Sequence, residues 1–306
     1  MTPPARGRPS PEWFDAQYNS RARIPEHPAI LAHWASASAQ ALERHADMVE
    51  RAYGTGRRER LDVFPARRPG APVLVYIHGG YWRALSKRDH SFVAPPFVDA
   101  GAMVVAPDYA LCPEVTIEQI VLQMVQALAW VHRHARDFGG DPSRIVVAGH
   151  SAGGHLATML LACNWASVDP ALPTDLVKSV VSISGLYDLE PMRNTPFLAP
   201  DLRLTRASAR RLSPAFLPAP GGSLVAVVGA DESEEFHRQV ALIASHWGDR
   251  VVTALSVPGR NHMNVLHELA EPTSTVHAHA LASLGLGSGG TRIGSGSERD
   301  SRKAKT

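Results

Sequence analysis

Short apolar runs alternate with longer amphipathic stretches along most of the 306-residue chain. Each apolar run has the length of a strand and is followed within two residues by Gly or Pro, which favour turns. Six runs are predicted as buried strands: Val73–Ile77, Met103–Ala106, Ile145–Ala148, Val180–Ser184, Leu224–Val228 and Val251–Val257. Three stretches are predicted as helices: Ile117–Arg136, Gly153–Cys163 and Glu234–Trp247. This alternation predicts an α/β domain whose mostly parallel sheet has helices on both faces, with Glu59–Phe64 as an extra antiparallel edge strand.

The two ends of the chain differ in composition from the part between them. Residues 1–10 are rich in Pro and Arg, and residues 285–306 are rich in Gly, Ser and charged side chains. Such sequences bury too little apolar surface to offset the entropy lost on ordering, so both ends are predicted to be disordered. Residues 11–284 are predicted to form a single domain, because a chain of this length with 44% hydrophobic residues can bury one large core.

Composition also restricts the partners of the protein. The formal net charge is +2 and no basic stripe stands out, so nucleic acid is not expected as a ligand. The sequence lacks a run of about 18 apolar residues and an apolar signal-peptide core. We therefore expect a soluble, cytoplasmic protein that acts on a small molecule and does not bind membranes.

Metal chemistry finds little support in the sequence. Its 15 histidines are scattered, without an HExxH motif or a His/Cys cluster. Cys112 and Cys163 have no metal-ligand spacing and are expected to be buried free thiols. No metal and no organic cofactor is predicted.

The strongest chemical signal is the sequence GHSAG at residues 149–153. It matches Gly-x-Ser-x-Gly and stands directly between a predicted strand and a predicted helix. In the nucleophile elbow of α/β-hydrolases, this sharp turn lifts the serine hydroxyl above the edge of the sheet, and the glycines relieve crowding of the backbone. Ser151 is therefore predicted to be the nucleophile of an α/β-hydrolase.

A second motif, HGGYW at residues 78–82, ends the strand predicted at Val73–Ile77. Hydrolases of this fold use a loop at this place to supply backbone N–H groups to the oxyanion hole. We predict that the N–H groups of Gly79, Gly80 and Ala152 bind the oxyanion. His78 is interpreted as a structural residue.

The general base is expected after the last predicted strand, Val251–Val257, because the fold delivers its catalytic histidine from that point. His262 lies in the loop that follows this strand. It is preferred over His267, His277 and His279, which are interpreted as surface or packing residues.

The acid of the triad is expected in the loop after Leu224–Val228. Asp231 and Glu232 both occur there, and successive side chains rarely point the same way, so only one of them can orient the imidazole. Either choice keeps the order serine, acid, histidine along the chain. Spacing favours Glu232, three residues after Gly229, with Asp231 as the alternative.

Together these residues resemble the kynurenine formamidases, a branch of the α/β-hydrolases close to the hormone-sensitive-lipase-like esterases. The resemblance extends over residues 12–284. Two segments are more specific to formamidases than the HGGYW motif or the elbow, namely SGLYDLEP at residues 184–191 and ESEEFHRQ at residues 232–239. In the family pattern the acid directly precedes the serine of the second segment, which implies Glu232.

The resemblance implies hydrolysis of N-formyl-L-kynurenine to L-kynurenine and formate through a Ser-His-acid triad and a formyl-enzyme intermediate, without a cofactor. Tyr81 and Trp82 are candidates for the wall that holds the aromatic leaving group. Arg83, Asn261 and Asn264 are candidates to bind its amino and carboxylate groups. A carboxylesterase acting on short-chain or aryl esters is the alternative function. A homodimer is suggested only by analogy.

Overall fold

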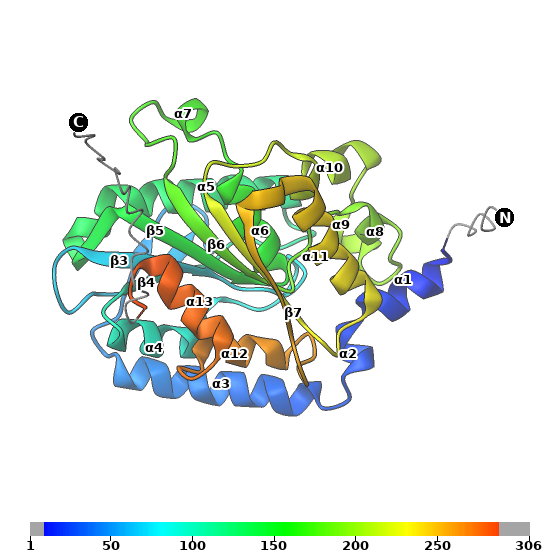
Figure 1. Ribbon diagram of the computed structural model, residues 1–306, viewed down its shortest axis with the longest axis horizontal. Helices are drawn as coiled ribbons and strands as arrows, with labels where there is room; N and C mark the ends of the chain where they lie inside the picture. The colour runs from blue at the N-terminus through cyan, green and yellow to red at the C-terminus, as the bar shows by residue number, and fades with distance from the viewer. Residues whose placement is uncertain (1–8, 288–306) are drawn as a thin grey trace, which may run out of the picture.

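The central sheet determines where the functional loops meet. The computed structural model describes residues 9–287, and within this range one sheet has eight strands in the order β1-β2-β4-β3-β5-β6-β7-β8 (Figure 1). The strands are β1 (Val49–Ala52), β2 (Arg60–Phe64), β3 (Ala71–Ile77), β4 (Met103–Pro107), β5 (Gly140–His150), β6 (Val177–Ile183), β7 (Ser223–Gly229) and β8 (Val251–Val257). Neighbouring strands from β4 through β3 to β8 are parallel, whereas β2 is antiparallel to β1 and β4. The predicted α/β class with a mostly parallel sheet is confirmed.

The sheet departs from the prediction at its two edges. The antiparallel strand predicted at residues 59–64 is present as β2, but β1 pairs with it on the outside, so β2 is not an edge strand. The sequence of β1, VERA, is short and mostly exposed, and no apolar run indicates it. At the other edge, residues of β8 alternate between half-buried and exposed, so the prediction of a buried strand is wrong there.

Helices cover both faces of the sheet. The α-helices of the described residues are α1 (Pro11–Tyr18), α2 (Ser20–Arg23), α3 (His27–Arg44), α4 (Ala94–Asp99), α5 (Ile117–His134), α6 (Ala152–Leu161), α7 (Trp165–Val168), α8 (Glu190–Arg193), α9 (Ala199–Leu202), α10 (Arg206–Arg211), α11 (Glu234–Trp247), α12 (His267–Ala270) and α13 (Thr275–Leu284). Short 3₁₀ helices occur at η1 (Lys87–Val93), η2 (Ala135–Phe138), η3 (Pro214–Phe216), η4 (Gly248–Arg250) and η5 (Asn264–Leu266). The three predicted helices correspond to α5, α6 and α11. Helix α5 begins at a capping box formed by Thr116 and Gln119.

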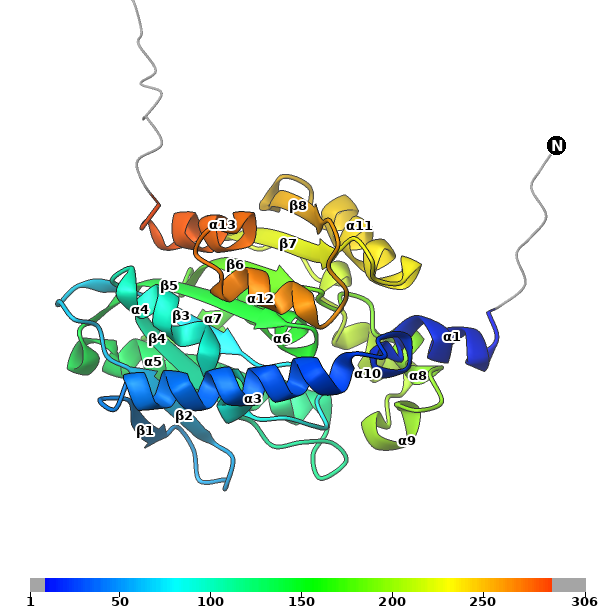
Figure 2. The same ribbon diagram turned by 90° about the horizontal axis from the view of Figure 1, so that it is seen from below.

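Alternating side chains on each strand divide the core into two layers. On β3, Val73, Val75 and Ile77 pack with residues of α5, α6 and α11. Leu74 and Tyr76 point to the opposite face and pack with residues of α3, α4, α12 and α13. The two helical layers are visible in Figures 1 and 2. Because both faces are buried, the inner strands are continuous apolar runs, which is why the sequence indicates them.

Residues 11–24, which we call the N-terminal segment, contain α1 and α2 and lie beside α11 and the connection between β6 and β7 (Figure 2). The buried Tyr18 hydroxyl donates a hydrogen bond to Glu235 of α11, with an oxygen–oxygen distance of 2.6 Å. Asp15 accepts a hydrogen bond of 3.2 Å from the backbone N–H of Phe197. The segment is thus held by parts of the chain that follow it by 182 and 217 residues.

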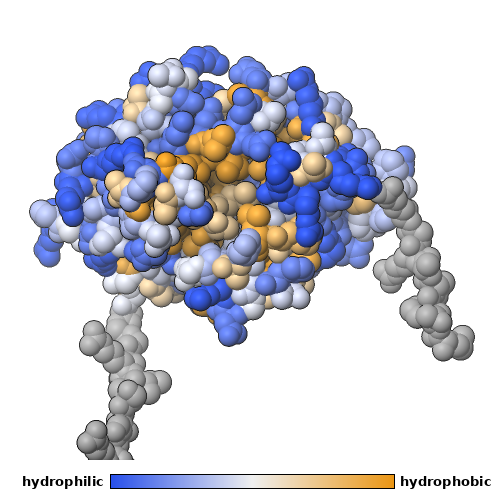
Figure 3. All heavy atoms as spheres, turned by 90° about the horizontal axis from the view of Figure 1, so that it is seen from above, coloured by the Kyte–Doolittle hydropathy of each residue, from blue (hydrophilic) through white to orange (hydrophobic). Residues whose placement is uncertain are grey.

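Figure 3 shows apolar residues gathered in a hollow of the face seen from above Figure 1, with polar residues around it. Among residues 9–287, no helix has the length and hydrophobicity needed to cross a membrane. The disorder predicted for the two ends falls mostly on residues 1–8 and 288–306, outside the described residues. Ser10 lies within them and caps α1 by accepting a hydrogen bond from the N–H of Trp13.

Candidate active site

Ser151 occupies a sharp turn between β5 and α6. Its backbone has φ 56° and ψ −118°, a conformation that non-glycine residues rarely adopt and that is often found at functional sites. A Cβ atom on Gly149 would lie only 2.2 Å from the carbonyl oxygen of Gly153, so the turn requires the flanking glycines. The structure therefore has the strand, turn and helix of a nucleophile elbow at this position.

His262 lies next to Ser151, although 111 residues separate them in the chain. Its Nε2 atom is 3.1 Å from the Ser151 Oγ atom, and its Nδ1 atom is 2.7 Å from Oε2 of Glu232. The His262 ring also packs against Phe236, with ring centroids 4.3 Å apart. Both ring nitrogens are therefore engaged, in the geometry by which a histidine takes a proton from a serine while a carboxylate holds it in place.

Glu232, and not its neighbour Asp231, faces the histidine. Its side chain is fully buried, and Oε1 accepts hydrogen bonds from the Ser184 hydroxyl at 2.5 Å and from the Gly229 N–H at 2.8 Å. Asp231 is exposed and has no hydrogen bond to His262. Among the two carboxylates that the sequence left open, the geometry favours Glu232.

The HGGYW loop lies beside the elbow because β3 and β5 are neighbours and Ile77 pairs with Gly149. A Cβ atom on Gly79 would lie 3.3 Å from the Cβ of Ser151 and 2.8 Å from the carbonyl oxygen of His150. Within residues 9–287, the N–H groups of Gly79 and Gly80 donate no hydrogen bond. The N–H of Ala152 is at the start of α6, where no helical partner exists. These three predicted donors remain available to a ligand oxygen.

Tyr109 fixes the direction of two of these N–H groups. Its hydroxyl group lies 2.9 Å from the carbonyl oxygen of His78 and 3.3 Å from that of Gly79, close enough to donate to both. In a trans peptide the C=O and the following N–H point in opposite directions, so the N–H groups of Gly79 and Gly80 point away from Tyr109. His78 stacks on the Tyr109 ring and its Nε2 lies 3.0 Å from Asp108, which agrees with the structural role expected for it.

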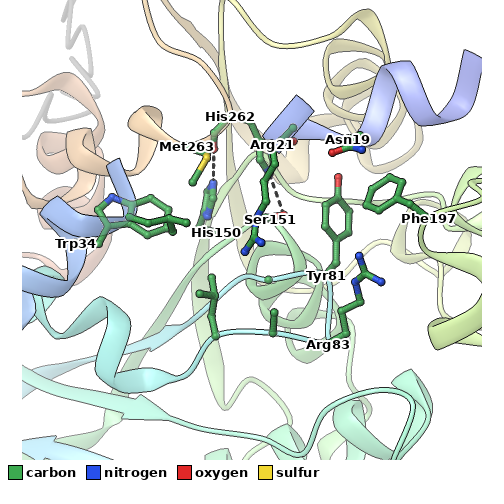
Figure 4. A pocket seen from close by; sticks show the side chains of 15 residues that line it. Asn19, Arg21, Trp34, Tyr81, Arg83, His150, Ser151, Phe197, His262 and Met263 are labelled. Carbon is green, nitrogen blue, oxygen red and sulfur yellow. Dashed lines mark hydrogen bonds between the residues drawn. The ribbon is translucent and has the colours of Figure 1, made fainter. Parts of the chain in front are cut away.

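A cavity of about 280 Å³ opens above Ser151. Its aromatic lining comes from Trp34 of α3, Tyr81 of the HGGYW loop and Phe197 of the β6–β7 connection, as Figure 4 shows. Polar side chains of the N-terminal segment form another part of the wall, including Ser20 and Arg21. The site can therefore hold a small, partly aromatic molecule against the serine.

The comparisons with known proteins agree with this geometry. Residues 74–246 match a family model described as alpha/beta hydrolase fold. The kynurenine formamidase of Salmo salar is 32% identical over 231 residues, which are 72% of this chain and 76% of the salmon protein. The chain belongs to the kynurenine formamidase family of α/β-hydrolases. It is a hydrolase.

Two other proteins show the wider relationships of this formamidase-family chain. The esterase LipQ of Mycobacterium tuberculosis is 33% identical over 153 residues, 46% of this chain and 36% of LipQ. A crystal structure of a proposed thioesterase from Silicibacter sp. tm1040 superposes with a TM-score of 0.77 at 29% identity, over 86% of this chain and 97% of that one. Ester-cleaving proteins are thus relatives as well.

The two segments that resemble formamidases most specifically meet in the structure. Gln239 of the second segment accepts hydrogen bonds of 2.8 Å from the backbone N–H groups of Tyr187 and Asp188 in the first. Ser184 of the first segment donates to Glu232 of the second. The two segments therefore bind each other, and Ser184 supports the triad acid directly.

The prediction that Trp82 forms part of the leaving-group wall is wrong. Its side chain is fully buried and packs edge-on against His155, with ring centroids 5.0 Å apart. The cause is backbone conformation, because Gly80, Tyr81 and Trp82 have φ angles of 104°, 49° and 57°, and this tight turn directs Trp82 into the core. Tyr81 lines the cavity as predicted, and its hydroxyl donates to the carbonyl oxygen of Tyr18.

The residues suggested for polar recognition are mostly engaged with the protein. Arg83 lines the cavity but forms a salt bridge with Asp201 and lies over the Phe197 ring. The Asn261 side chain binds Glu26 and the following loop, and Asn264 accepts from the Asn261 N–H. Each of the three therefore already has a partner within the protein.

The remaining histidines do not act as alternatives to His262. His267 accepts a hydrogen bond from Trp34 at 2.8 Å, and His277 bonds the Leu269 carbonyl oxygen. His150, to which the sequence assigned no role, bonds the His262 carbonyl oxygen at 2.7 Å, and burial holds its pKa well below the ordinary value. Being neutral, it positions the loop of His262 without adding charge to the cavity. Within residues 9–287, no cluster of His, Cys, Asp and Glu is arranged to hold a metal ion.

Proposed function

We propose that the protein hydrolyses the formamide bond of N-formyl-L-kynurenine to give L-kynurenine and formate. The observation that supports this most is the hydrogen-bonded chain from Glu232 through His262 to Ser151, at the floor of a small aromatic-lined cavity in a member of this family. The cavity volume of about 280 Å³ is near the lower end for small-molecule sites, roughly 300–1,000 Å³, which favours a compact substrate.

In the proposed acylation step, the Ser151 Oγ atom attacks the formyl carbon while His262 Nε2 takes the hydroxyl proton. The carbonyl oxygen becomes an oxyanion, which the N–H groups of Gly79, Gly80 and Ala152 stabilise. When the intermediate collapses, the C–N bond breaks and His262 gives its proton to the departing aryl nitrogen. The products of this step are kynurenine and a formyl ester on Ser151.

Deacylation repeats these steps with water. His262 takes a proton from a water molecule that attacks the formyl ester, and the ester C–O bond then breaks. His262 gives this proton to the Ser151 oxygen, and the product leaves as formic acid, which ionises to formate and a proton. Buried Glu232 stabilises the protonated imidazole in both halves of the cycle, and its bonds from Ser184 and Gly229 keep it in the orientation that this requires.

The aromatic lining of the cavity suits the leaving group. Trp34, Tyr81 and Phe197 offer ring faces and edges to an aryl ring, whereas the formyl group carries no side chain and needs little room. Short-chain or aryl esters would fit the same site, and the relationship to an esterase makes them the second candidate class of substrate.

Purified wild-type protein and the Ser151→Ala variant would test the assignment. The release of kynurenine from N-formyl-L-kynurenine is followed by absorbance, with p-nitrophenyl acetate assayed in parallel. We expect turnover of the formamide, and a fall in kcat of roughly 10⁵- to 10⁶-fold in Ser151→Ala. If the ester alone is hydrolysed through Ser151, the protein is an esterase and the proposed substrate is wrong. If the variant retains formamide turnover, the proposed nucleophile is wrong.

A further inference from the structure

Arg21 stands out among the residues that line the cavity. It belongs to α2 of the N-terminal segment, and Figure 4 shows its side chain extending into the cavity that also contains Ser151. The sequence gives no hint of this placement, because 130 residues separate the two positions. Arg21 therefore belongs to the site although it is remote from every catalytic motif.

The charges around the cavity are unbalanced. Of its 15 lining residues none is Asp or Glu, and the permanently charged ones are Arg21 and Arg83. Arg83 is neutralised by its salt bridge with Asp201. Arg21 by contrast is an exposed residue that also lines the cavity, and within residues 9–287 it forms neither a salt bridge nor a side-chain hydrogen bond with the protein. The cavity thus presents one guanidinium without a counter-charge.

A ligand group of negative charge would complete this arrangement. Guanidinium and carboxylate groups match in shape, since two N–H donors can bind both carboxylate oxygens, and ion-paired hydrogen bonds are stronger than neutral ones. An anionic ligand also meets no carboxylate on the wall of the cavity. A ligand whose only charge is positive would meet Arg21 without any compensating acid.

We propose that Arg21 binds a carboxylate of the substrate and makes the enzyme selective for substrates that carry this carboxylate over substrates of the same shape that lack it. The identity of the substrate as an aryl formamide rests on the proposed function, whereas the preference for a carboxylate group applies to any acyl compound cleaved at Ser151. Arg21 is a specificity-determining residue in this proposal. It takes no part in the proton transfers.

The first test compares N-formyl-L-kynurenine with its carboxamide, in which a neutral amide replaces the carboxylate while the α-ammonium group stays, so that the acid is a zwitterion and the carboxamide a cation. Wild-type protein should show a KM for the acid that is about 10- to 100-fold lower, as expected for hydrogen bonds to a charged group. Arg21→Gln should raise the KM for the acid by the same factor and should not raise the KM for the carboxamide. Its kcat should stay within about threefold of wild type, because Arg21 would bind ground state and transition state alike.

Two further variants distinguish recognition of the carboxylate by Arg21 from a general effect of losing a positive charge in α2. Arg21→Lys keeps the charge but not the two-pronged geometry, so it should recover part of the preference for the acid. Arg23→Gln removes the same charge two residues away, from a side chain that bonds the Ala16 carbonyl oxygen and does not line this cavity. The Arg23→Gln variant should retain the full preference for the acid over the carboxamide.

Equal KM values for acid and carboxamide in wild type would overturn the proposal, as would an equal loss of both substrates in Arg21→Gln. If neither formamide is turned over, a pair of aryl acetates with and without a carboxylate takes their place. A preference for the anionic ester that disappears in Arg21→Gln would then uphold the anion site while the formamidase function fails. The absence of such a preference would reject the anion site as well.

Discussion

The side chains of the triad and the walls of the cavity come from contrasting parts of the fold. Ser151, Glu232 and His262 each follow the carboxyl end of a parallel strand, at β5, β7 and β8. The walls are built by α2, α3 and the β6–β7 connection, which contribute Arg21, Trp34 and Phe197. The strand ends lie close together because the sheet is continuous. They therefore determine the positions of the three catalytic side chains. The other segments lie outside the sheet, and they are where specificity can differ between relatives.

Neutralising each of the two adjacent carboxylates in turn tests the residues at the strand ends. Among the predictions, this one should give the largest change in kcat. Glu232→Gln removes the charge opposite His262 with little change in shape, and we expect kcat to fall by about 10³- to 10⁴-fold, as loss of the triad acid does elsewhere. Asp231→Asn is the matched control, and its exposed side chain should leave kcat within about twofold of wild type. Steady-state kinetics of both variants would decide the matter. The reverse ranking would assign the acid to Asp231.

The same contrast explains what the sequence could predict. The strands and the elbow depend on neighbouring residues, so an apolar run followed by Gly-x-Ser-x-Gly is sufficient to locate Ser151. His262 and the choice of two acids follow from their positions after the last strands. Glu232 is then distinguished by Ser184 and Gly229, which bind it only in the folded chain.

The walls could not be predicted in this way. Helix α2 has four residues and no periodic pattern, so nothing near Arg21 indicates that it reaches Ser151. Trp82 is next to Tyr81 in sequence, yet the positive φ angles of the loop send the two side chains to different places. Strand β1 was missed because its VERA sequence lacks an apolar run. In each case the decisive contact lies far along the chain or in an uncommon backbone conformation.

Weakening the attachment of the N-terminal segment tests the role of the cavity wall. Tyr18 donates to Glu235 at 2.6 Å and lies 3.2 Å from the amide nitrogen of Gln239, and burial together with the Glu235 charge raises the pKa of its phenol well above the ordinary value. Tyr18→Phe removes a buried donor to a charged group, so the free energy of unfolding should fall by about 1–3 kcal/mol. KM should rise severalfold while kcat changes little, because the segment forms the wall of the cavity and not the triad.

Tyr76→Phe is the matched control for Tyr18→Phe. The Tyr76 hydroxyl is buried, and among the described residues it has no hydrogen-bond partner. Its removal should leave stability unchanged or slightly increased, since a buried polar group without a partner is unfavourable. Urea unfolding and steady-state kinetics measure both variants. A Tyr18→Phe protein as stable and as active as wild type would show that the segment is held by other contacts.

The pH dependence of the free energy of unfolding tests a helix that packs on the sheet, and not the N-terminal segment. It should show the smallest of the expected changes. Burial lowers the pKa of His155, on α6, to about 4. Its contribution to stability is complete above the unfolded pKa of about 6.5, and is lost as the pH falls from there toward 4, because the unfolded chain binds a proton that the folded one does not. In His155→Gln, the slope of unfolding free energy against pH between 5 and 6 should therefore be smaller by up to about 1.4 kcal/mol per pH unit. Urea titrations at several pH values measure this slope, and His246→Gln, which removes an exposed histidine at the end of α11, should leave it unchanged. An unaltered slope in His155→Gln would mean that this histidine is protonated as readily in the folded protein as in the unfolded chain.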